Sequence, residues 1–397
     1  MEKTEVLIIG GGASGLICAA KIDSRSVIIL ERGDRVGRKL SATGNGQGNV
    51  TNENMSEEHY FSVSGNTKKR IGAMLSRFGK DDMLGFLEGL GGFFLPDSKG
   101  RIYPSGKQAS AVTDLLRFTV AAQGKKIVTG AFVTDIRKSG NGYEITAKTE
   151  GGSARYYANK VVLATGGMAA KNFGTDGNGF AIAKKLGHTV TDLFPSLVQI
   201  KTDVKHTKTL KGIRVNAAVA AISGGKEIGS AKGDVIFADY GVSGDAVFRL
   251  SAFITANKGG VTLSIDLLPE VSEEKLISLI QNKKKISLLP STELLCGILN
   301  NQVGRAVLKR AGSLDPKVIA KTVKSFTLPV TGNLGFDYAQ VTKGGVPLSE
   351  VTDGLESKKS TGVYFTGEIL DVDGECGGYN LQWAYTSASV VADTINQ

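Results

Sequence analysis

The chain has 397 residues, of which 41% are hydrophobic and 22% are charged, so it is long enough for two or three domains with packed cores. No apolar run approaches the roughly 18–20 residues that a membrane helix needs, so we expect no membrane partner. The formal net charge of +10 is spread over short, separate groups of Lys and Arg, without a long basic tract or an aromatic-rich RNA-binding motif. We therefore expect no nucleic-acid partner.

Residues able to bind metals or form disulfides are scattered. The three cysteines and three histidines show no paired spacing, which argues against a disulfide framework, a CxxC redox pair and a His/Cys metal site. Cysteines without such spacing suit a reducing compartment, so we predict a cytoplasmic protein that binds no metal. The apolar start at residues 6–20 lacks the positive flank of a signal peptide and contains four glycines.

The first element is a compact strand–helix–strand unit. Residues 5–10 and 26–30 are short apolar runs typical of buried parallel strands, and residues 14–22 favour a helix. The intervening Gly-Gly-Gly-Ala-Ser-Gly is a G-x-G-x-x-G motif, whose glycines allow a tight turn, approach of a pyrophosphate and close helix packing. Glu31 follows at the distance where an acid binds a ribose, and its charge disfavours an NADP 2′-phosphate. The predicted dinucleotide contacts are Gly10, Gly12, Ala13, Ser14, Gly15, Glu31 and Arg32.

Residues 33–60 indicate a long functional loop, followed by helical patterns at 67–90 and 108–123. Within the loop, residues 37–52 contain two cations followed by small residues and amides, which suit phosphate oxygens and the polar edge of a flavin. A surface loop without a ligand is the alternative. The candidate contacts are Arg38, Lys39, Thr43, Gly44, Asn45 and Asn49.

Strand patterns return at residues 126–135, 142–149, 154–158 and 161–164. The last of these ends in Ala-Thr-Gly-Gly, which would bring the backbone close to a dinucleotide a second time. An ordinary strand-to-turn junction would have the same appearance. The candidate contacts are Ala164, Thr165, Gly166 and Gly167.

The second half of the chain contains a strand-rich region, then a helical region and then further strands. Strands dominate residues 196–266, interrupted by a helix for which Ser243 is the expected N-cap, and residues 272–324 are helical. Strand-like segments at 326–345 and 362–366 precede a final helix over 380–396. A helix N-terminus aimed at the N1/C2=O edge of a flavin would stabilise the charge of the reduced ring. The candidate contacts there are Gly367, Glu368, Gly378, Tyr379 and Asn380.

Five segments resemble a bacterial family of FAD-binding proteins that includes aminoacetone oxidase and 3-dehydro-bile acid Δ4,6-reductase. Residues 37–52 are similar to the family's GRKLLATGNGRCNLTN, residues 164–167 to ATGG, residues 237–244 to FTxYGxSG, residues 328–332 to LPVTG, and residues 367–384 to GEVLDVDGxCGGYNLQWA. The resemblance implies an α/β fold with a discontinuous Rossmann-like FAD-binding domain over 1–190 and 346–397. An inserted β-barrel-like domain over 191–266 and 326–345 would carry a small helical insert over 267–325.

The resemblance also implies an FAD-dependent oxidoreductase that transfers a hydride between flavin N5 and a small organic substrate such as an enone or ketosteroid. We predict non-covalent FAD, with NAD(P)H as a transient donor because no second G-x-G-x-x-G lies between a strand and a helix. The alternatives are an amine oxidase that uses O₂ and, in another class, a flavin-binding sensory or nucleic-acid-interacting protein. Gln47-Gly48 replaces the family's Arg-Cys, so a mechanism that needs that thiol is in doubt here.

No acid–base residue follows from the sequence, and the oligomeric state stays open. Tyr379, Tyr103 and Cys376 are weak catalytic candidates, for which packing roles are the competing interpretation. His188 follows a predicted helix, where an imidazole commonly binds terminal carbonyl groups. We expect it to be structural.

Overall fold

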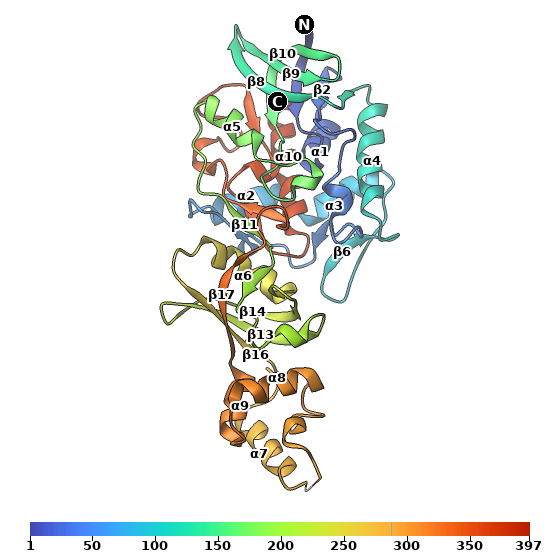
Figure 1. Cartoon of the computed structure of the whole chain (residues 1–397). Helices are drawn as coiled ribbons and strands as arrows, with labels where there is room; N and C mark the ends of the chain where they lie inside the picture. Colours follow the sequence, from blue (N-terminus) through green and yellow to red (C-terminus); the bar gives the residue numbers. More distant parts are fainter. Residues whose placement is uncertain (287) are drawn as a thin grey trace. The chain divides into compact units, whose positions relative to one another are not determined.

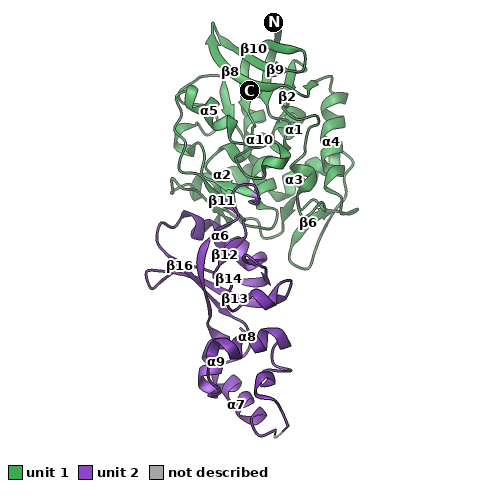
Figure 2. Cartoon of the chain, in the orientation of Figure 1, with its two compact units in different colours: residues 1–194, 341–397 green, residues 195–340 purple. Residues whose placement is uncertain are grey.

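The structure is a computed structural model that describes residues 1–286 and 288–397. It contains two compact units, drawn in different colours in Figure 2. Unit 1 comprises residues 1–194 and 341–397, and unit 2 comprises residues 195–340. The chain passes between them near β11 (Phe194–Ser196) and β18 (Val341–Lys343). The expected α/β class, with a barrel inserted into a Rossmann-like fold, is confirmed.

The largest sheet of unit 1 has seven strands. Figure 1 labels four of them, β2, β8, β9 and β10, near the N-terminus. The strand order of this sheet is β7-β2-β1-β10-β9-β8, with β19 also paired to β10. β7, β2, β1, β10 and β19 run parallel, whereas β8 and β9 form an antiparallel extension. The strands are β1 (Glu2–Ile9), β2 (Val27–Leu30), β7 (Lys126–Val128), β8 (Phe132–Ser139), β9 (Gly142–Thr149), β10 (Gly152–Leu163) and β19 (Val363–Phe365).

β10 differs from the sequence prediction of two strands at 154–158 and 161–164. The structure merges them into one strand of 12 residues. Residues 152–158 pair with β9, while residues 156–163 pair with β1, so one continuous strand joins the antiparallel and parallel parts of the sheet. The prediction was wrong because the polar residues in the middle of the strand hide its continuity.

Helices cover the sheet, and the last one is almost entirely buried. α10 packs beside α1, and its buried residues include Trp383 and Tyr385 together with polar Thr386 and Ser387. This burial explains why the C-terminal helix has no clear polar face in the sequence. The helices of unit 1 are α1 (Ala13–Lys21), α2 (Lys68–Arg77), α3 (Lys80–Gly89), α4 (Ala109–Ala122), α5 (Asn178–Lys185) and α10 (Tyr379–Asn396).

Two small sheets connect the loop after residue 50 to distant segments. One contains β3 (Thr51–Asn52), β6 (Arg101–Pro104) and β5 (Phe94–Pro96), and the other pairs β4 (Tyr60–Phe61) with β20 (Asp373–Gly374). The sequence did not indicate these pairings, because strands of two or three residues are too short to show an alternating pattern.

Unit 2 combines a closed barrel with helices. The barrel order is β12-β15-β14-β13-β16-β17, and the described pairs are antiparallel. Its strands are β12 (Ile200–Thr202), β13 (Arg214–Ser223), β14 (Lys226–Phe237), β15 (Gly241–Ser243), β16 (Val261–Asp266) and β17 (Phe326–Asn333). Its helices are α6 (Asp245–Ala256), α7 (Glu273–Lys283), α8 (Asn301–Ala311) and α9 (Pro316–Lys324).

The helix starts of unit 2 follow local rules with one exception. The side chains of Ser272, Asn300 and Asp315 accept backbone hydrogen bonds as the N-caps of α7, α8 and α9. The predicted Ser243 cap of α6 is wrong. Ser243 belongs to β15, and Gly244 is the N-cap without a side-chain bond, because a methyl group there would lie 2.3 Å from the Asp234 carbonyl oxygen. Within the described part of the chain, none of the helices has both the length and the apolar character required to span a membrane.

Candidate functional site

Three parallel strands of unit 1 end together at one edge of the sheet. Ile9 of β1 pairs with Leu163 of β10, and Leu163 pairs with Phe365 of β19. The segments that follow these strands, residues 10–15 and 164–168 and 366–370, therefore leave the same edge. In open α/β sheets, ligands bind beyond the carboxyl ends of the strands. The fold thus gathers three predicted contact segments that lie far apart in the sequence.

The glycine turn after β1 is required by close backbone packing. A methyl group at Gly10 would lie 2.4 Å from the Ala164 carbonyl oxygen, and one at Gly15 would lie 2.0 Å from the Gly10 carbonyl oxygen. By contrast, a methyl group at Gly12 would meet nothing within 4 Å. Gly12 is also the N-cap of α1 and carries no side-chain cap. Open space beside an uncapped helix N-terminus fits a phosphate group.

The Glu31 carboxylate lies against this turn. Its Oε2 accepts a hydrogen bond from the Gly11 backbone N–H at 2.8 Å, and its Oε1 accepts one from Gly33 at 2.7 Å. Each oxygen keeps a further lone pair for a ribose hydroxyl. Arg32 is occupied elsewhere: it forms an ion pair with Asp176 at 2.7 Å. The structure therefore supports a ligand contact for Glu31 and offers none for the Arg32 side chain.

A chain of polar contacts joins the 37–52 segment to the other two turns. Lys39 Nζ lies 2.7 Å from Glu368 Oε2, and Glu368 Oε1 accepts a hydrogen bond from the Thr342 backbone N–H at 3.0 Å. Thr342 Oγ1 accepts hydrogen bonds from the Met168 and Ala169 backbone N–H groups at 2.7 and 3.0 Å. Lys39 and Glu368 are thereby fixed by each other, at the place where both were predicted to bind a cofactor.

The remaining candidates in residues 37–52 shape the backbone of this segment. The buried Asn49 amide donates hydrogen bonds to the Thr51 and Ile102 carbonyl oxygens. Gly44 and Asn45 adopt left-handed φ values of 59° and 56°, which fold the segment back on itself. Two side chains donate to nearby carbonyl oxygens, Thr43 to Leu40 at 2.7 Å and Arg38 to Asn172 at 2.8 Å.

The turn after β10 contains a buried hydroxyl group without a partner. Thr165 Oγ1 has no hydrogen bond to any part of the chain that the structure describes. The adjacent Gly166 has a φ of +70°, and a methyl group at Gly167 would lie 2.5 Å from Glu368 Oε1. An unsatisfied buried hydroxyl costs about 1–3 kcal/mol, and this one faces α5, where a methyl group at Gly179 would lie 1.8 Å from it.

The turn after β19 is locked to both helices that flank it. Gly367 has a φ of +77°, and a methyl group there would lie 2.7 Å from Ser14 Oγ of α1. The Gly367 backbone N–H donates a hydrogen bond to Ser387 Oγ of α10 at 2.9 Å. Ser14 and Gly367 therefore fix α1 against the turn.

The N-terminus of α10 faces the 37–52 segment. Its N-cap Gly378 has a φ of +102° and no side-chain cap, and a methyl group there would lie 2.4 Å from the Thr51 carbonyl oxygen. The Asn380 side chain closes the preceding loop by accepting from the Gly374 N–H at 2.9 Å and donating to the Gly374 carbonyl at 2.8 Å. The helix start is thus held rigidly while its dipole end stays without a capping side chain.

The three catalytic candidates from the sequence lie in unit 1 with different surroundings. Tyr379 is 5% exposed and stacks on His59 with ring centroids 4.4 Å apart. Burial raises the pKa of Tyr103, whose ring lies 5.8 Å from the Arg101 guanidinium. Cys376 is half-buried directly before the Gly377-Gly378 pair. Among these candidates, Tyr379 is the one with an ionisable ring as a stacking partner.

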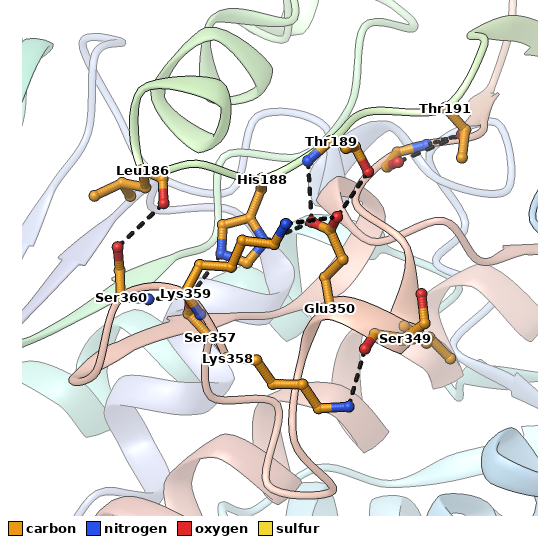
Figure 3. A network of polar contacts seen from close by, with 12 residues as sticks. Leu186, His188, Thr189, Thr191, Ser349, Glu350, Ser357, Lys358, Lys359 and Ser360 are labelled. Atoms are coloured by element: carbon orange, nitrogen blue, oxygen red, sulfur yellow. Dashed lines mark hydrogen bonds and ion pairs between the residues drawn. The ribbon is translucent and has the colours of Figure 1, made fainter.

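His188 belongs to a structural network instead of a helix cap (Figure 3). Its Nδ1 lies 2.9 Å from Glu350 Oε2 and its Nε2 lies 2.6 Å from Ser357 Oγ. Ser357 Oγ also accepts the backbone N–H groups of Lys359 and Ser360. The Ser–His–Glu arrangement resembles a hydrolytic triad, but the hydroxyl is committed to its own turn and the imidazole is buried. The expected contacts of His188 with helix carbonyl groups were therefore wrong.

The comparisons with known proteins agree with this geometry. Residues 4–394 match the family described as HI0933-like protein Rossmann domain. The chain belongs to this family. It is 36% identical over 402 residues to 3-dehydro-bile acid delta(4,6)-reductase of Clostridium scindens, covering 96% of both chains. It is 28% identical over 410 residues to ribosomal RNA dihydrouridine synthase of Haemophilus influenzae, covering 100% of this chain and 99% of the relative.

Solved structures support the fold. The 3-ketosteroid-delta4-(5alpha)-dehydrogenase from Rhodococcus jostii RHA1 has a TM-score of 0.54 at 16% identity, covering 100% of this chain and 97% of the other. The 3-ketosteroid delta1-dehydrogenase from Sterolibacterium denitrificans has a TM-score of 0.56 at 13% identity, with both chains fully covered. The resemblance seen in the sequence is confirmed, and this protein of the HI0933-like family is an FAD-dependent oxidoreductase.

Several residues of the site were missed by sequence reasoning. Thr342 connects two turns, yet nothing in its strand-like surroundings marks it. His59 and Glu375 approach each other across the small β4–β20 sheet, with His59 Nδ1 3.3 Å from Glu375 Oε2. Glu375 stands two positions before the Gly377-Gly378 pair, which was a usable signal, whereas His59 lies in a segment without periodicity.

Proposed function

We propose that the protein reduces a carbon–carbon double bond conjugated to a carbonyl group, using non-covalent FAD. The observation that carries this proposal is the chemistry shared by the names of its relatives. The Δ4 bond of a 3-keto steroid and the C5=C6 bond of uridine are both conjugated to a carbonyl group. Two relatives with different substrates thus point to one type of acceptor.

The residues of unit 1 fit the binding part of this function. The α1 N-terminus and Gly12 would hold the pyrophosphate, and Glu31 would hold the adenosine ribose. The uncapped α10 N-terminus would stabilise negative charge on the flavin ring. Bound flavin supplies a hydride at N5. The residues of this site would bind and orient it, and the Lys39–Glu368 pair joins the 37–52 segment to the turn after β19.

A nicotinamide is proposed as a transient donor. Within residues 1–286 and 288–397, β1 and α1 form the glycine-rich strand–turn–helix unit, and unit 2 contains a barrel and helices instead of a second one. NAD(P)H would then bind weakly over the flavin and leave before the acceptor enters. This order requires ping-pong kinetics with parallel double-reciprocal lines. Intersecting lines would instead indicate a second nucleotide site.

A uracil base in RNA is the second candidate acceptor. Two relatives are named ribosomal RNA dihydrouridine synthase, and unit 2 has 19 Lys and Arg against 12 Asp and Glu in residues 195–340. A small enone is the first candidate because the reductase is the more similar relative at 36% identity. Neither acceptor is an amine, so the proposal replaces the amine-oxidase alternative.

The test is anaerobic stopped-flow spectroscopy of the purified yellow protein. NADH or NADPH should bleach the flavin, and 4-androstene-3,17-dione or unmodified ribosomal RNA should restore its colour. Recovery with the steroid alone favours the first candidate, and recovery with RNA alone favours the second. Recovery only with O₂, together with peroxide formation from aminoacetone, would contradict the proposal and support an amine oxidase.

A further inference from the structure

A histidine–carboxylate pair lies at the start of α10 in unit 1. His59 ends the short 3-10 helix Glu57–His59, and its Nδ1 lies 3.3 Å from Glu375 Oε2. The Glu375 backbone N–H also donates a hydrogen bond to the His59 carbonyl oxygen at 3.0 Å. The imidazole is stacked on Tyr379 at 4.4 Å between centroids, with an interplanar angle of 25°. Three contacts therefore fix the position and the plane of this ring.

The pair lies where two of the cofactor-contact segments meet. β4 directly follows His59 and pairs with β20, which directly precedes Glu375. Two residues after Glu375, the Gly377 carbonyl oxygen accepts a hydrogen bond from Asn52 Nδ2 at 2.9 Å, and Gly378 lies against Thr51. The imidazole is consequently tied to the end of the 37–52 segment and to the α10 N-terminus.

Exposure and charge at this place suit proton exchange. The His59 side chain is 29% exposed and that of Glu375 is 25% exposed, so the ring is neither sealed in the core nor freely solvated. The Glu375 carboxylate at Nδ1 fixes that side of the ring and leaves Nε2 as the nitrogen on the other side. The other charged groups on its helix point to α2: the Glu57 carboxylate lies beside Gly72, and Glu58 pairs with Lys68.

We propose that His59, oriented by Glu375 and Tyr379, is the catalytic proton donor for the double-bond reduction, an inference that rests on the proposed function. Reduction of a conjugated double bond adds a hydride to the β-carbon and a proton to the α-carbon. Bound reduced flavin would supply the hydride with both electrons, and His59 Nε2 would donate the proton. The neutral imidazole then regains a proton from water through its exposed edge. Glu375 is a positioning residue, because it acts through the ring.

The other ionisable groups of the region are less suited to this role. Lys343 Nζ donates a hydrogen bond to the buried Asp373 carboxylate at 3.3 Å, so it already has a partner. Burial raises the pKa of Tyr103, and the Tyr60 hydroxyl donates to the Tyr379 carbonyl oxygen in the core. His59 combines partial exposure, a carboxylate partner and a fixed plane.

The first experiment separates proton donation from electron transfer. His59→Asn is compared with wild type and with Glu58→Gln, which removes a carboxylate from the same short helix without altering the ring contacts. A general acid contributes roughly 10²–10⁴-fold, so flavin reoxidation by the acceptor that wild type reduces should slow at least about 100-fold in His59→Asn. Reoxidation by ferricyanide, which requires no proton on carbon, should stay within about 2-fold. The wild-type decline of the rate with rising pH should be absent in His59→Asn, and Glu375→Gln should lose less rate than His59→Asn.

The second experiment needs no turnover. Ionisation of an imidazole beside the flavin changes the visible absorption spectrum of the oxidised flavin. A pH titration of the wild-type holoprotein should therefore show a spectral transition. This transition should persist in Glu58→Gln and disappear in His59→Asn. An unchanged reoxidation rate and pH profile in His59→Asn would overturn the inference. If wild type reduces no conjugated acceptor, the proposed function fails. The pH titration of the flavin spectrum still decides whether His59 lies beside the flavin. A spectral transition that persists in His59→Asn rejects that placement.

Discussion

Units 1 and 2 are specified by different kinds of residues. In unit 1, a methyl group at Gly10 or Gly378 would lie 2.4 Å from a carbonyl oxygen of a distant segment, and one at Gly167 or Gly367 would lie 2.4 or 2.7 Å from a side-chain oxygen of a distant segment. In unit 2, α7, α8 and α9 begin at side-chain caps that act within a few residues. The charge also differs, since residues 195–340 have seven more basic than acidic residues and the larger unit 1 has only three more. The glycine contacts of unit 1 bring the predicted ligand-contact segments together, whereas the side-chain caps of unit 2 specify where helices begin and do not indicate a ligand.

The largest expected effect comes from replacing glycines of unit 1. It tests whether each glycine is required for backbone packing or for the approach of a ligand. Gly15→Ala should destabilise the protein by about 1–3 kcal/mol, as overpacking does, because its methyl group would meet the Gly10 carbonyl at 2.0 Å. Gly12→Ala should leave the melting temperature of the flavin-free protein unchanged and weaken FAD binding more than about 10-fold. Thermal unfolding and FAD titration of both variants check this. An equal loss of thermal stability in Gly12→Ala and Gly15→Ala would show that both glycines are required for packing.

The next effect concerns Glu31. Glu31→Ala removes hydrogen-bond acceptors for Gly11 and Gly33 as well as the predicted ribose contact. FAD retention should fall by roughly 1.5–3 kcal/mol, the range for hydrogen bonds to charged groups, while the rate at saturating FAD should hardly change. Arg32→Ala is the matched control, because Arg32 pairs with Asp176 outside the turn and should affect FAD retention little. A larger loss of FAD retention in Arg32→Ala than in Glu31→Ala would assign the cofactor contact to Arg32 instead of Glu31.

Part of the candidate site could be predicted from the sequence. The G-x-G-x-x-G motif and Glu31 are local in the sequence, so their place at the strand ends followed from pattern alone. Thr342 and His59 could not be found in this way, because their roles depend on contacts with residues 26 to 316 positions away. The continuous β10 strand was also missed, since its two halves serve different partners.

A smaller effect tests the charge of unit 2. Lys275, Lys309 and Lys317 are exposed on α7, α8 and α9. Reversal of all three to Glu should leave steroid enone reduction within about 2-fold, because a neutral acceptor gains little from surface charge. RNA binding, where present, should weaken and lose part of its salt dependence. Rates and RNA affinities at two salt concentrations measure this. A strong fall in steroid reduction would show that this surface contributes to the reaction.

The smallest expected effect is on the pH dependence of the stability of unit 1. Burial lowers the pKa of His188 despite the neighbouring Glu350 carboxylate, so the folded protein holds the imidazole neutral where the unfolded chain takes up a proton. Stability must then fall as the pH drops below the ordinary histidine value of 6.5. Burial opposes ionisation of Glu350, but hydrogen bonds from Thr189, Lys359 and His188 outweigh it and lower its pKa, so its contribution is lost only at more acidic pH. Between pH 7 and 5 the His188 effect therefore dominates. His188→Asn should melt at a lower temperature than wild type at pH 7 and lose less of its melting temperature between pH 7 and 5. A steeper loss in the variant would mean that His188 is charged in the folded protein and stabilises it as an ion pair.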